Sequence, residues 1–508
     1  MHMPRGPAGR PWRFDINLAD DAVASAPSHE RLARALVREI QRGRLDAGAL
    51  LPGSRVLAES LGVNRKVVVA ALDELCAQGW LEAEPARGTR VAQRLPEMPV
   101  AEVRAARASN DSSSANPIDI KVSDGAPDAR LAPLDAIARA HRRALKALSR
   151  GGLGYGDPAG DPVLREVLAA FVNQARGLSC NVEEMLISRG SQGALSLVAF
   201  TLCHPGDVVA VETPGYVPSW RTFEFAGASL IRIPIDAEGL VTTELEAQAA
   251  ALRGRLKGVY LTPHHQYPTT VALSPQRRAH LRALAAEHEF TLIEDDYDYE
   301  YHFDGTPLLP LSAASDPRVR TIYVGSLSKL IAPAFRVGYM VADAAFVRRA
   351  SAVRELIDRQ GDVVLERAIA ELIEDGELQR HARRARRIYR QRRDAMVSLL
   401  QSDPRLKDAI DVESPAGGLA VWVRVKNPVS VLDWSRAAAE RGLFFAPGAT
   451  HVEHGDLPAF RAGFASFSAE ELVRVVDLLG ASLGDVLQSA AAPDSGLRGT
   501  AREKRTGD

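Results

Sequence analysis

The first clear hydrophobic pattern along the chain lies in residues 29–43, HERLARALVREIQRG. Apolar side chains recur there at intervals of three and four residues, the period of an amphipathic helix: Leu32, Leu36, Val37 and Ile40. Gly43 stands where such a helix would stop. The pattern therefore predicts one helix that buries a single face.

Two further helical patterns occupy residues 51–80, LPGSRVLAESLGVNRKVVVAALDELCAQGW. The tripeptide GVN between them predicts a tight turn, with Ser54 capping the first helix and Asn64 capping the second. Two helices joined by so short a turn form a helix-turn-helix. On the second helix three apolar side chains share one face for burial: Val68, Leu72 and Leu75.

The exposed start of the second helix carries Arg65 and Lys66, which a helix-turn-helix presents to the DNA major groove. Residues 80–91, WLEAEPARGTRV, then predict two short strands joined by a turn. The result would be a wing whose tip carries Arg87 and Gly88.

The net charge supports DNA binding only modestly. From residue 27 to residue 94, eleven Lys or Arg stand against eight Asp or Glu, a net charge of +3. A three-helix protein-binding domain with solvated arginines would show the same excess. The whole chain carries a net charge of -1, so any DNA contact must come from a local patch.

The pattern changes in residues 118–487. Short apolar runs typical of buried strands, such as DVVAVE, LKGVYLT, FTLIEDD and RTIYVGS, alternate with longer helical segments. This alternation predicts an α/β domain with a mostly parallel sheet flanked by helices. Residues 95–117, rich in Pro, Ala, Ser and Asn, predict a linker, and residues 488–508 predict a disordered tail.

Composition restricts the class of protein. At 508 residues the chain exceeds what one core usually organises, so we expect at least two domains. The chain has three widely spaced cysteines, Cys76, Cys180 and Cys203. This spacing argues against a disulfide framework and against a zinc site, and we expect no metal. The first residues, MHMPRGPAGRPWRF, lack a continuous apolar run, so we expect no signal peptide. No run of about 18 apolar residues occurs, so we expect no membrane span and place the protein in the cytoplasm.

Candidate chemistry begins with GSLSKLIAPAFRVGY, residues 325–339. It places Lys329 three residues after Ser326, directly behind a predicted strand, with Arg336 seven residues further on. A lysine can form a Schiff base with an aldehyde, and the aldehyde cofactor of amino-acid chemistry is pyridoxal phosphate. Its phosphate requires a helix N-terminus with hydroxyls and an arginine. Its ring requires a carboxylate and an aromatic partner.

Residues that meet these requirements follow other predicted strands. Ser191 and Gln192 open a helical run, and Tyr216 follows a Pro-Gly turn. The buried run FTLIEDDYDYEY, residues 290–301, ends in two aspartates and a tyrosine: Asp295, Asp296 and Tyr297. Each signal has a simpler explanation, as a solvated lysine, a turn or a helix cap. Together they indicate a ligand site, because open α/β sheets bind ligands at their strand ends.

The N-terminal pattern LPGSRxLAxxLGVNRxxVxxAxxxLxxxGWL resembles the winged helix-turn-helix of the GntR regulators. The resemblance implies DNA contacts by four residues: Arg55, Asn64, Arg65 and Gly88. Arg65 is best placed for a base edge, and Lys66 or Arg55 for phosphate. Two departures bear on the operator, since Lys66 stands where Thr is common and Val69 where several relatives carry arginine.

Six motifs of the larger region resemble those of fold-type I aminotransferases in the same order. They are YGDPAGDPVLREVLAAF (155–171), GSQGAL (190–195), TPGY (213–216), EDDYD (294–298), SLSK (326–329) and FRAGFA (460–465). The whole chain is therefore similar to the MocR-type regulators, in which a GntR winged helix is fused to such a domain.

This resemblance implies a role for individual residues. Lys329 would bind pyridoxal phosphate covalently, Asp295 would pair with its ring nitrogen and Tyr216 would stack on its ring. Tyr297 would donate to the ring hydroxyl. Four residues would hold the phosphate: Ser191, Gln192, Ser326 and Arg336. The sequence does not decide between Asp295 and Asp296.

Two further residues would act at the edges of the site. Arg461 matches the arginine that grips an amino-acid carboxylate, with the bidentate geometry that lysine lacks. Tyr155 matches the tyrosine that reaches the partner's cofactor in a homodimer. One motif departs from the family, because HHQYPTT at residues 264–270 replaces the usual NPTG. The asparagine is missing, and Thr270 replaces a glycine.

These inferences predict a pyridoxal phosphate-dependent transcriptional regulator that binds a double-stranded operator as a homodimer. The signal would be pyridoxal phosphate itself or an amino acid or amine. The alternative is a working aminotransferase with a vestigial DNA-binding domain. The well-formed recognition helix and wing favour the regulator, and the altered 264–270 motif is expected to impair full transamination. We therefore do not expect an enzyme, and a residual aminotransferase-type half-reaction stays open.

Overall fold

A computed structural model describes residues 28–41, 45–84, 88–93, 95, 119–122, 125–314, 316–426 and 428–491. The chain divides into two compact units, residues 1–114 and residues 115–508. Each unit has a buried apolar core of its own. Most of the predicted linker, and residues 492–508 of the predicted tail, lie outside the described residues.

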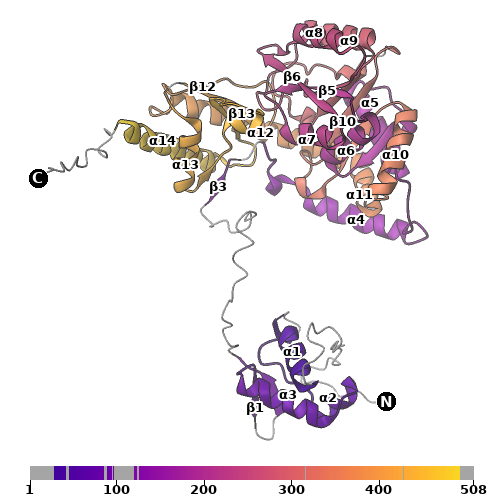
Figure 1. The fold of residues 1–508 in the computed structure, drawn as a ribbon, viewed down its shortest axis with the longest axis vertical. Coiled ribbons are helices and arrows are strands. Elements are labelled where there is room, and N and C mark those ends of the chain that lie inside the picture. Colours follow the sequence, from indigo (N-terminus) through magenta and orange to yellow (C-terminus); the bar gives the residue numbers. More distant parts are fainter. Residues whose placement is uncertain are drawn as a thin grey trace, which may run out of the picture. The chain divides into compact units, whose positions relative to one another are not determined.

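In its described part, the N-terminal unit contains three helices followed by a two-stranded antiparallel sheet (Figure 1). The elements are α1 (Ser28–Gln41), α2 (Ser54–Leu61), α3 (Arg65–Ala77), β1 (Leu81–Glu84) and β2 (Gly88–Val91). Their core is apolar and includes the side chains that the helical patterns predicted: Leu32, Leu36, Ile40, Val68, Leu72 and Leu75. The predicted helix-turn-helix and wing are confirmed. Gly43, the predicted stop of α1, lies outside the described residues.

One of the two predicted helix caps is present. The side chain of Asn64 accepts a hydrogen bond from the backbone N–H of Lys66 at 2.9 Å and caps α3. The prediction for Ser54 is wrong, because Gly53 is the N-cap of α2 and its carbonyl accepts the first helical bond, from Leu57. Ser54 is therefore already inside the helix, and its Oγ instead accepts from Nε of Arg65 at 3.3 Å.

The large unit is built on a sheet of eight strands among the described residues. In spatial order these are β4 (Met185–Ser188), β11 (Gly338–Val341), β10 (Thr321–Ser326), β9 (Thr291–Asp296), β8 (Leu256–Leu261), β5 (Val208–Thr213), β6 (Ser229–Asp236) and β7 (Gly239–Leu240). The pairs from β10 to β6 are parallel, whereas β11 and β7 run antiparallel to their neighbours. The predicted mostly parallel sheet is confirmed.

Helices cover both faces of this sheet (Figure 1). One face packs against α6 (Gly190–Leu202), α7 (Val217–Phe225) and α10 (Ala344–Ile357). The other packs against α5 (Pro162–Arg176), α8 (Thr242–Leu252) and α9 (Pro275–His288), with α4 (Leu134–Leu148) and α11 (Val363–Glu374) around α5. Because both faces are buried, the strands are apolar along most of their length.

The C-terminal part of the large unit forms a smaller antiparallel sheet with helices around it. Its elements are α12 (Glu377–Ser402), β12 (Ile410–Val412), β13 (Ala420–Val425), α13 (Val431–Glu440), β14 (Leu443–Phe444), β15 (Ala459–Gly463) and α14 (Ala469–Ala491). The short strand β3 (Ile120–Lys121), just after the predicted linker, pairs with β14. Six 3-10 helices complete the described elements: Ala129–Leu131, Val182–Glu184, Tyr299–Tyr301, Leu311–Ala313, Pro333–Phe335 and Gly448–His451.

The boundary predicted for the C-terminal tail is too early. Helix α14 continues to Ala491, beyond the predicted limit at residue 487. Val486 still packs against the core, and the alanines that follow favour helix over coil. Among the described helices, none combines the length and the apolar character that a membrane crossing needs.

We expect Leu75→Ala to destabilise the N-terminal unit alone, by about 2–5 kcal/mol, because Leu75 is fully buried in a core that the large unit does not share. Hydrogen exchange followed by mass spectrometry should show faster exchange in α1 and α3, with β9 and β10 unchanged. Val69→Ala on the same helix is the control, since Val69 is 37% exposed and should change stability by at most about 0.5 kcal/mol. Faster exchange in β9 and β10 as well would contradict two independent cores.

Candidate functional site

Three of the predicted DNA-binding side chains lie at one end of the helix-turn-helix. Arg55, Arg65 and Lys66 are exposed in the first turns of α2 and α3. The bond between Arg65 and Ser54 brings these two helix starts together. Gly88 opens β2 with a φ of +101°, in the left-handed region that glycine adopts without strain. Arg87 lies outside the described residues.

Lys329 follows the end of β10 in the large unit. Its Nζ donates a hydrogen bond to the carbonyl oxygen of Gly125 at 2.8 Å. Its own carbonyl oxygen accepts from the hydroxyl of Tyr301 at 3.0 Å. The amine is therefore held at the carboxyl edge of the parallel sheet, against a backbone segment that lies just after the predicted linker.

The two candidate aspartates at the end of β9 point to opposite faces of the sheet. Oδ2 of Asp295 accepts from the hydroxyl of Tyr260 at 2.8 Å, on the face covered by α6 and α7. Oδ2 of Asp296 accepts from the hydroxyl of Tyr323 at 2.7 Å, on the face covered by α5. Successive side chains of a strand alternate between faces, so neighbouring carboxyls have separate surroundings.

The Asp295 carboxyl is buried and incompletely paired. Burial raises its pKa to about 7, the hydrogen bond from Tyr260 opposes this, and the charge of Asp298 adds to it. Its Oδ1 has no hydrogen-bond partner among the described residues. An unpaired buried carboxylate oxygen is costly, and a cationic N–H beside it would remove the cost. A protonated pyridine nitrogen is such a group.

The N-terminus of α6 meets an arginine and the end of β10. A Cβ added at Gly190 would lie 3.1 Å from Cζ of Arg336, so the guanidinium packs directly against the helix start. A Cβ at Gly338 would lie 2.8 Å from the backbone nitrogen of Ser191. Gly338 pairs with Ser326 across the sheet. These close approaches gather an arginine, two serines and a helix N-terminus, which together suit a phosphate.

Two side chains at this end hold polar atoms without partners among the described residues. Nε2 of Gln192 donates to Oγ1 of Thr222 at 2.7 Å, while its Oε1 is unpaired. Oγ of Ser328 is buried and unpaired, and the Ser328 backbone donates to Oγ of Ser326 at 3.2 Å. Ser328 was not predicted, although the SLSK motif that pointed to Ser326 contains it.

The predicted aromatic and carboxylate-binding residues form a second group. The ring of Tyr216 contacts that of Tyr267 edge to face, with centroids 5.2 Å apart. The guanidinium of Arg461, which is buried, lies 4.9 Å from the centroid of Tyr267. Its Nη2 lies 3.4 Å from the hydroxyl of Tyr297, and a Cβ at Gly125 would lie 3.6 Å from the same nitrogen. Tyr216, Tyr297 and Arg461 thus converge beside the segment that contacts Lys329.

In the altered motif at residues 264–270, Thr270 keeps the left-handed backbone conformation expected of the glycine that it replaces. Thr270 has a φ of +67°, in the left-handed region. The amide of Gln266 is buried, donates to the carbonyl of Pro214 at 2.9 Å and accepts from Oγ1 of Thr269 at 2.6 Å. The turn is therefore held by Gln266.

Tyr155 is not brought to the other predicted residues within the chain. Its side chain is 81% exposed, and its ring lies 4.2 Å from Cζ of Arg359. Two contacts at the site were not predicted from the sequence: the phenol of Tyr260 on Asp295 and the Gly125 carbonyl at Lys329. Period-two alternation along β8 identifies the face of Tyr260, but no local pattern identifies the contact of Gly125.

The chain matches two protein families. Residues 117–479 match the family described as aminotransferase class I and II. Residues 28–91 match the bacterial regulatory proteins of the gntR family. The first match covers more than half of the chain and confirms the prediction of a pyridoxal phosphate domain at the level of the family. The second confirms the predicted DNA-binding domain.

Several regulators are similar to the chain over most of its length. The probable rhizopine catabolism regulatory protein MocR of Rhizobium meliloti is 29% identical over 443 residues, which cover 84% of this chain and 87% of that protein. The HTH-type pyridoxine biosynthesis transcriptional regulator PdxR of Corynebacterium glutamicum is 32% identical over 393 residues, which cover 76% of this chain and 83% of that protein.

Solved structures of aminotransferases share the fold of the large unit. Kynurenine aminotransferase of Pyrococcus horikoshii, in complex with PMP, is 28% identical with a TM-score of 0.66 and covers 72% of this chain and 91% of its own. LysN, the alpha-aminoadipate aminotransferase of Thermus thermophilus, complexed with N-(5'-phosphopyridoxyl)-L-leucine, is 27% identical with a TM-score of 0.67 and covers 73% and 94%. The chain belongs to the MocR-type transcriptional regulators, in which a gntR family DNA-binding domain is joined to an aminotransferase class I and II domain.

Proposed function

We propose that this regulator binds pyridoxal phosphate at Lys329 and that the cofactor, or an amine that reacts with it, controls its action on DNA. One observation carries the proposal. The amine of Lys329 follows the end of β10, and at the adjoining end of β9 the buried Oδ1 of Asp295 has no hydrogen-bond partner among the described residues. When bound, the cofactor supplies an aldehyde for an amine and a conjugated ring that withdraws electrons.

Asp295, rather than Asp296, is the partner proposed for the ring nitrogen. Its carboxyl lies on the face of α6 and α7. Helix α6 carries two of the predicted phosphate residues, Ser191 and Gln192, and α7 follows Tyr216. Tyr260 orients Oδ2 and leaves Oδ1 for the cofactor. Asp296 faces the other side of the sheet, away from α6 and Tyr216, and there Tyr323 donates to its Oδ2 while the charge of Arg176 partly opposes the rise of its pKa on burial.

The phosphate would lie at the N-terminus of α6. Backbone N–H groups at a helix start favour an anion, and Arg336 adds a full positive charge against the same turn. The further ligands proposed are the hydroxyls and amide of three residues: Ser191, Gln192 and Ser326. The unpaired Oγ of Ser328 adds a donor that sequence analysis had not included.

Arg461 is the proposed recognition group for the carboxylate of an amino-acid effector. Its side chain is buried, and Tyr267 and Tyr297 restrict its movement. A held guanidinium loses little entropy when it pairs with a carboxylate in a bidentate way. If the cofactor itself is the signal, Arg461 would not need a ligand. The two classes of effector therefore differ in their dependence on Arg461.

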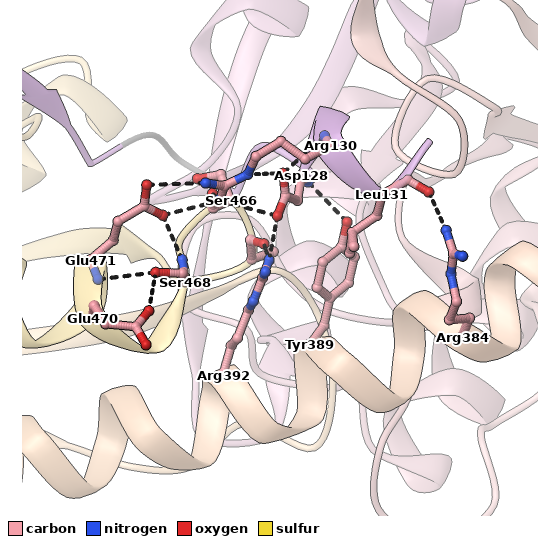
Figure 2. A network of polar contacts seen from close by, with 11 residues as sticks. Asp128, Arg130, Leu131, Arg384, Tyr389, Arg392, Ser466, Ser468, Glu470 and Glu471 are labelled. Atoms are coloured by element: carbon pink, nitrogen blue, oxygen red, sulfur yellow. Dashed lines mark hydrogen bonds and ion pairs between the residues drawn. The ribbon is translucent and has the colours of Figure 1, made fainter. Parts of the chain in front are cut away.

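The segment 125–131 offers a route from the site toward the N-terminal unit. At one end Gly125 accepts from Lys329. At the other end, as Figure 2 shows, the backbone N–H of Asp128 donates to Tyr389 at 2.9 Å and its Oδ2 accepts from Arg392 at 2.9 Å. Arg130 donates to Asp128 and to Glu471 at 3.0 Å (Figure 2). A ligand on Lys329 would remove one of these anchors, and β3, which pairs with β14, lies between this segment and the predicted linker.

The charges in this network favour a fixed segment. Burial would raise the pKa of Asp128, but hydrogen bonds from Arg130 and Arg392 hold it below its usual value. The carboxylate therefore stays charged at neutral pH. Arg392 joins the segment to α12, and Arg130 joins it to α14. Because the segment is held at residues 128–130, a displacement of Gly125 would shift the backbone on its N-terminal side.

A homodimer is proposed from an exposed apolar patch on the large unit. The ring of Tyr155 packs on Arg359, which joins the loop at 151–157 to the end of α10. Both segments expose large apolar side chains: Leu153, Tyr155, Leu356 and Ile357. A second copy of the chain would bury this patch, and a dimer suits the paired half-sites that helix-turn-helix proteins bind.

A second candidate function is transamination, because the Lys329, Asp295 and Arg461 set is complete. We expect turnover of amino acids with a keto-acid acceptor to be slow or absent, since the motif at 264–270 lacks its asparagine. Steady-state assays with aromatic, acidic and aliphatic amino acids measure this. Fast turnover together with no retention of the DNA upstream of the protein's own gene would favour the enzyme over the regulator.

We expect Lys329→Ala to abolish the visible absorbance of the purified protein, because no other amine is proposed to capture the cofactor aldehyde. Borohydride reduction and mass spectrometry should place a pyridoxyl group on the peptide that contains Lys329. Lys407→Ala, at an exposed lysine, is the control and should leave both unchanged. Trapping that persists in Lys329→Ala would disprove the assignment.

We expect Arg65→Ala to weaken binding to the DNA upstream of the protein's own gene by about 1–3 kcal/mol, or about 5- to 150-fold, if Arg65 contacts a base. Gel retardation at a fixed salt concentration measures this. Arg34→Ala in α1, where Arg34 pairs with Glu30 at 3.1 Å, is the control. Cofactor absorbance should stay unchanged in both variants, and its loss would indicate misfolding instead.

A further inference from the structure

Three histidine rings meet near the carboxyl edge of the sheet. His264 and His265 follow β8, and His302 follows the 3-10 helix Tyr299–Tyr301. One ring nitrogen of each lies within 4.8 Å of the others. Ring centroids are 4.5 Å apart for His264 and His265, 5.6 Å for His264 and His302, and 5.8 Å for His265 and His302. The sequence predicted no metal site, because its three cysteines are widely spaced.

Each of these rings has a buried nitrogen without a hydrogen-bond partner among the described residues. These atoms are Nε2 of His264, Nε2 of His265 and Nδ1 of His302. The exposed fraction is 6% for His264 and 2% for His265, so bulk water does not satisfy them. Each unsatisfied buried polar atom costs about 1–3 kcal/mol, and three such atoms in one place indicate a shared ligand.

The ring of His265 is oriented as in known metal sites. Its Nδ1 is 2.8 Å from Oδ1 of Asp298, and both side chains are almost fully buried. A carboxylate on Nδ1 fixes the tautomer that leaves a lone pair on Nε2, which is the arrangement of a metal-binding histidine with its supporting carboxylate. A Cβ at Gly417 would clash with that Nε2, so the ring packs closely against the Gly417 backbone and a residue with a side chain there would displace it.

The surrounding charges allow a cation. Arg176 and Arg278 lie near the cluster, but Arg176 forms an ion pair with Glu300. The guanidinium of Arg278 donates to three backbone carbonyls, those of Pro263, Leu273 and Leu309. The negative charge of Asp298 lies next to His265, and its Oδ2 has no hydrogen-bond partner among the described residues.

We propose that His264, His265 and His302 bind one divalent transition-metal ion, with Zn²⁺ as the ion to test first. Three imidazoles suit Zn²⁺, and tetrahedral Zn–N bonds of about 2.0–2.1 Å place the nitrogens about 3.3 Å apart. The rings must therefore close by up to about 1.5 Å, which rotation of the half-buried His302 can provide. The site is separate from Lys329 and does not rest on the cofactor proposal.

The ion would act as a structural clamp beside the cofactor site. The carbonyl of His265 accepts from the hydroxyl of Tyr297 at 2.9 Å. His302 forms an isolated β-bridge with Gly417. A metal on the three rings would thus fix the loop that carries Tyr297 against the 264–270 turn and the approach to β13. One ion would hold two separate segments of the chain together, and the bridge from His302 to Gly417 would connect them to a third.

The test uses the full-length chain without a polyhistidine tag, freed of metal with EDTA. Equilibrium dialysis against Zn²⁺ and elemental analysis should give one Zn²⁺ per chain. We expect His264→Gln with His302→Gln to weaken this binding by at least about tenfold. His204→Gln, at an exposed histidine beside Asp207, is the matched control and should bind as the unmodified chain does.

Two readouts separate a real site from misfolding. Co²⁺ in place of Zn²⁺ should give the visible absorption of a tetrahedral site in the unmodified chain and in His204→Gln only. His302→Gln alone removes the least buried ligand and should also weaken binding if the double variant fails to fold. No bound Zn²⁺ in the unmodified chain would overturn the proposal and would mean that the three nitrogens share only a water. Equal binding of Zn²⁺ by His302→Gln and by the unmodified chain would also overturn it. Retained cofactor absorbance would show that such a failure leaves the function at Lys329 intact.

Discussion

The parallel pairing of β9 with β10 is the constraint on which the large unit depends. In this register Asp295 lies opposite Val324 and Asp296 opposite Gly325, so both strands end at one edge of the sheet. The chain that follows each strand must leave the sheet there, and it carries Tyr297 and Lys329 with it. A slip of one residue would move Asp295 to the opposite face, away from α6 and α7.

Polar groups at this edge are buried in apolar surroundings, which is costly for the free protein. Burial raises the pKa of Asp295 and of Asp296, and a phenol satisfies only one oxygen of each. Such unsatisfied groups are common where a ligand completes the pairing. The large apolar cores on both faces of the sheet supply the stability that tolerates them.

Two segments rest on this edge from different directions. The segment 125–131 contacts Lys329 through Gly125 and is anchored to α12 and α14 by the network of Asp128. The histidine cluster contacts Tyr297 through the carbonyl of His265. A ligand at Lys329 and an ion at the histidines would therefore act on neighbouring backbone, and the first of these segments continues toward the DNA-binding unit.

The sequence by itself determined the two-unit organisation, the helix-turn-helix, the α/β class and the polar residues at the strand ends, because hydrophobic period and turn residues are local properties. Only the tertiary structure separated Asp295 from Asp296, since adjacent side chains on a strand point to opposite faces and the helices packed there make those faces different. It also decided the cap of α2, where a backbone carbonyl of Gly53 takes the place expected for Ser54. Gly125 and Lys329 are 204 residues apart, and the three histidines come from two separate loops. Contacts of this kind depend on how the whole chain packs, which no short stretch of sequence encodes.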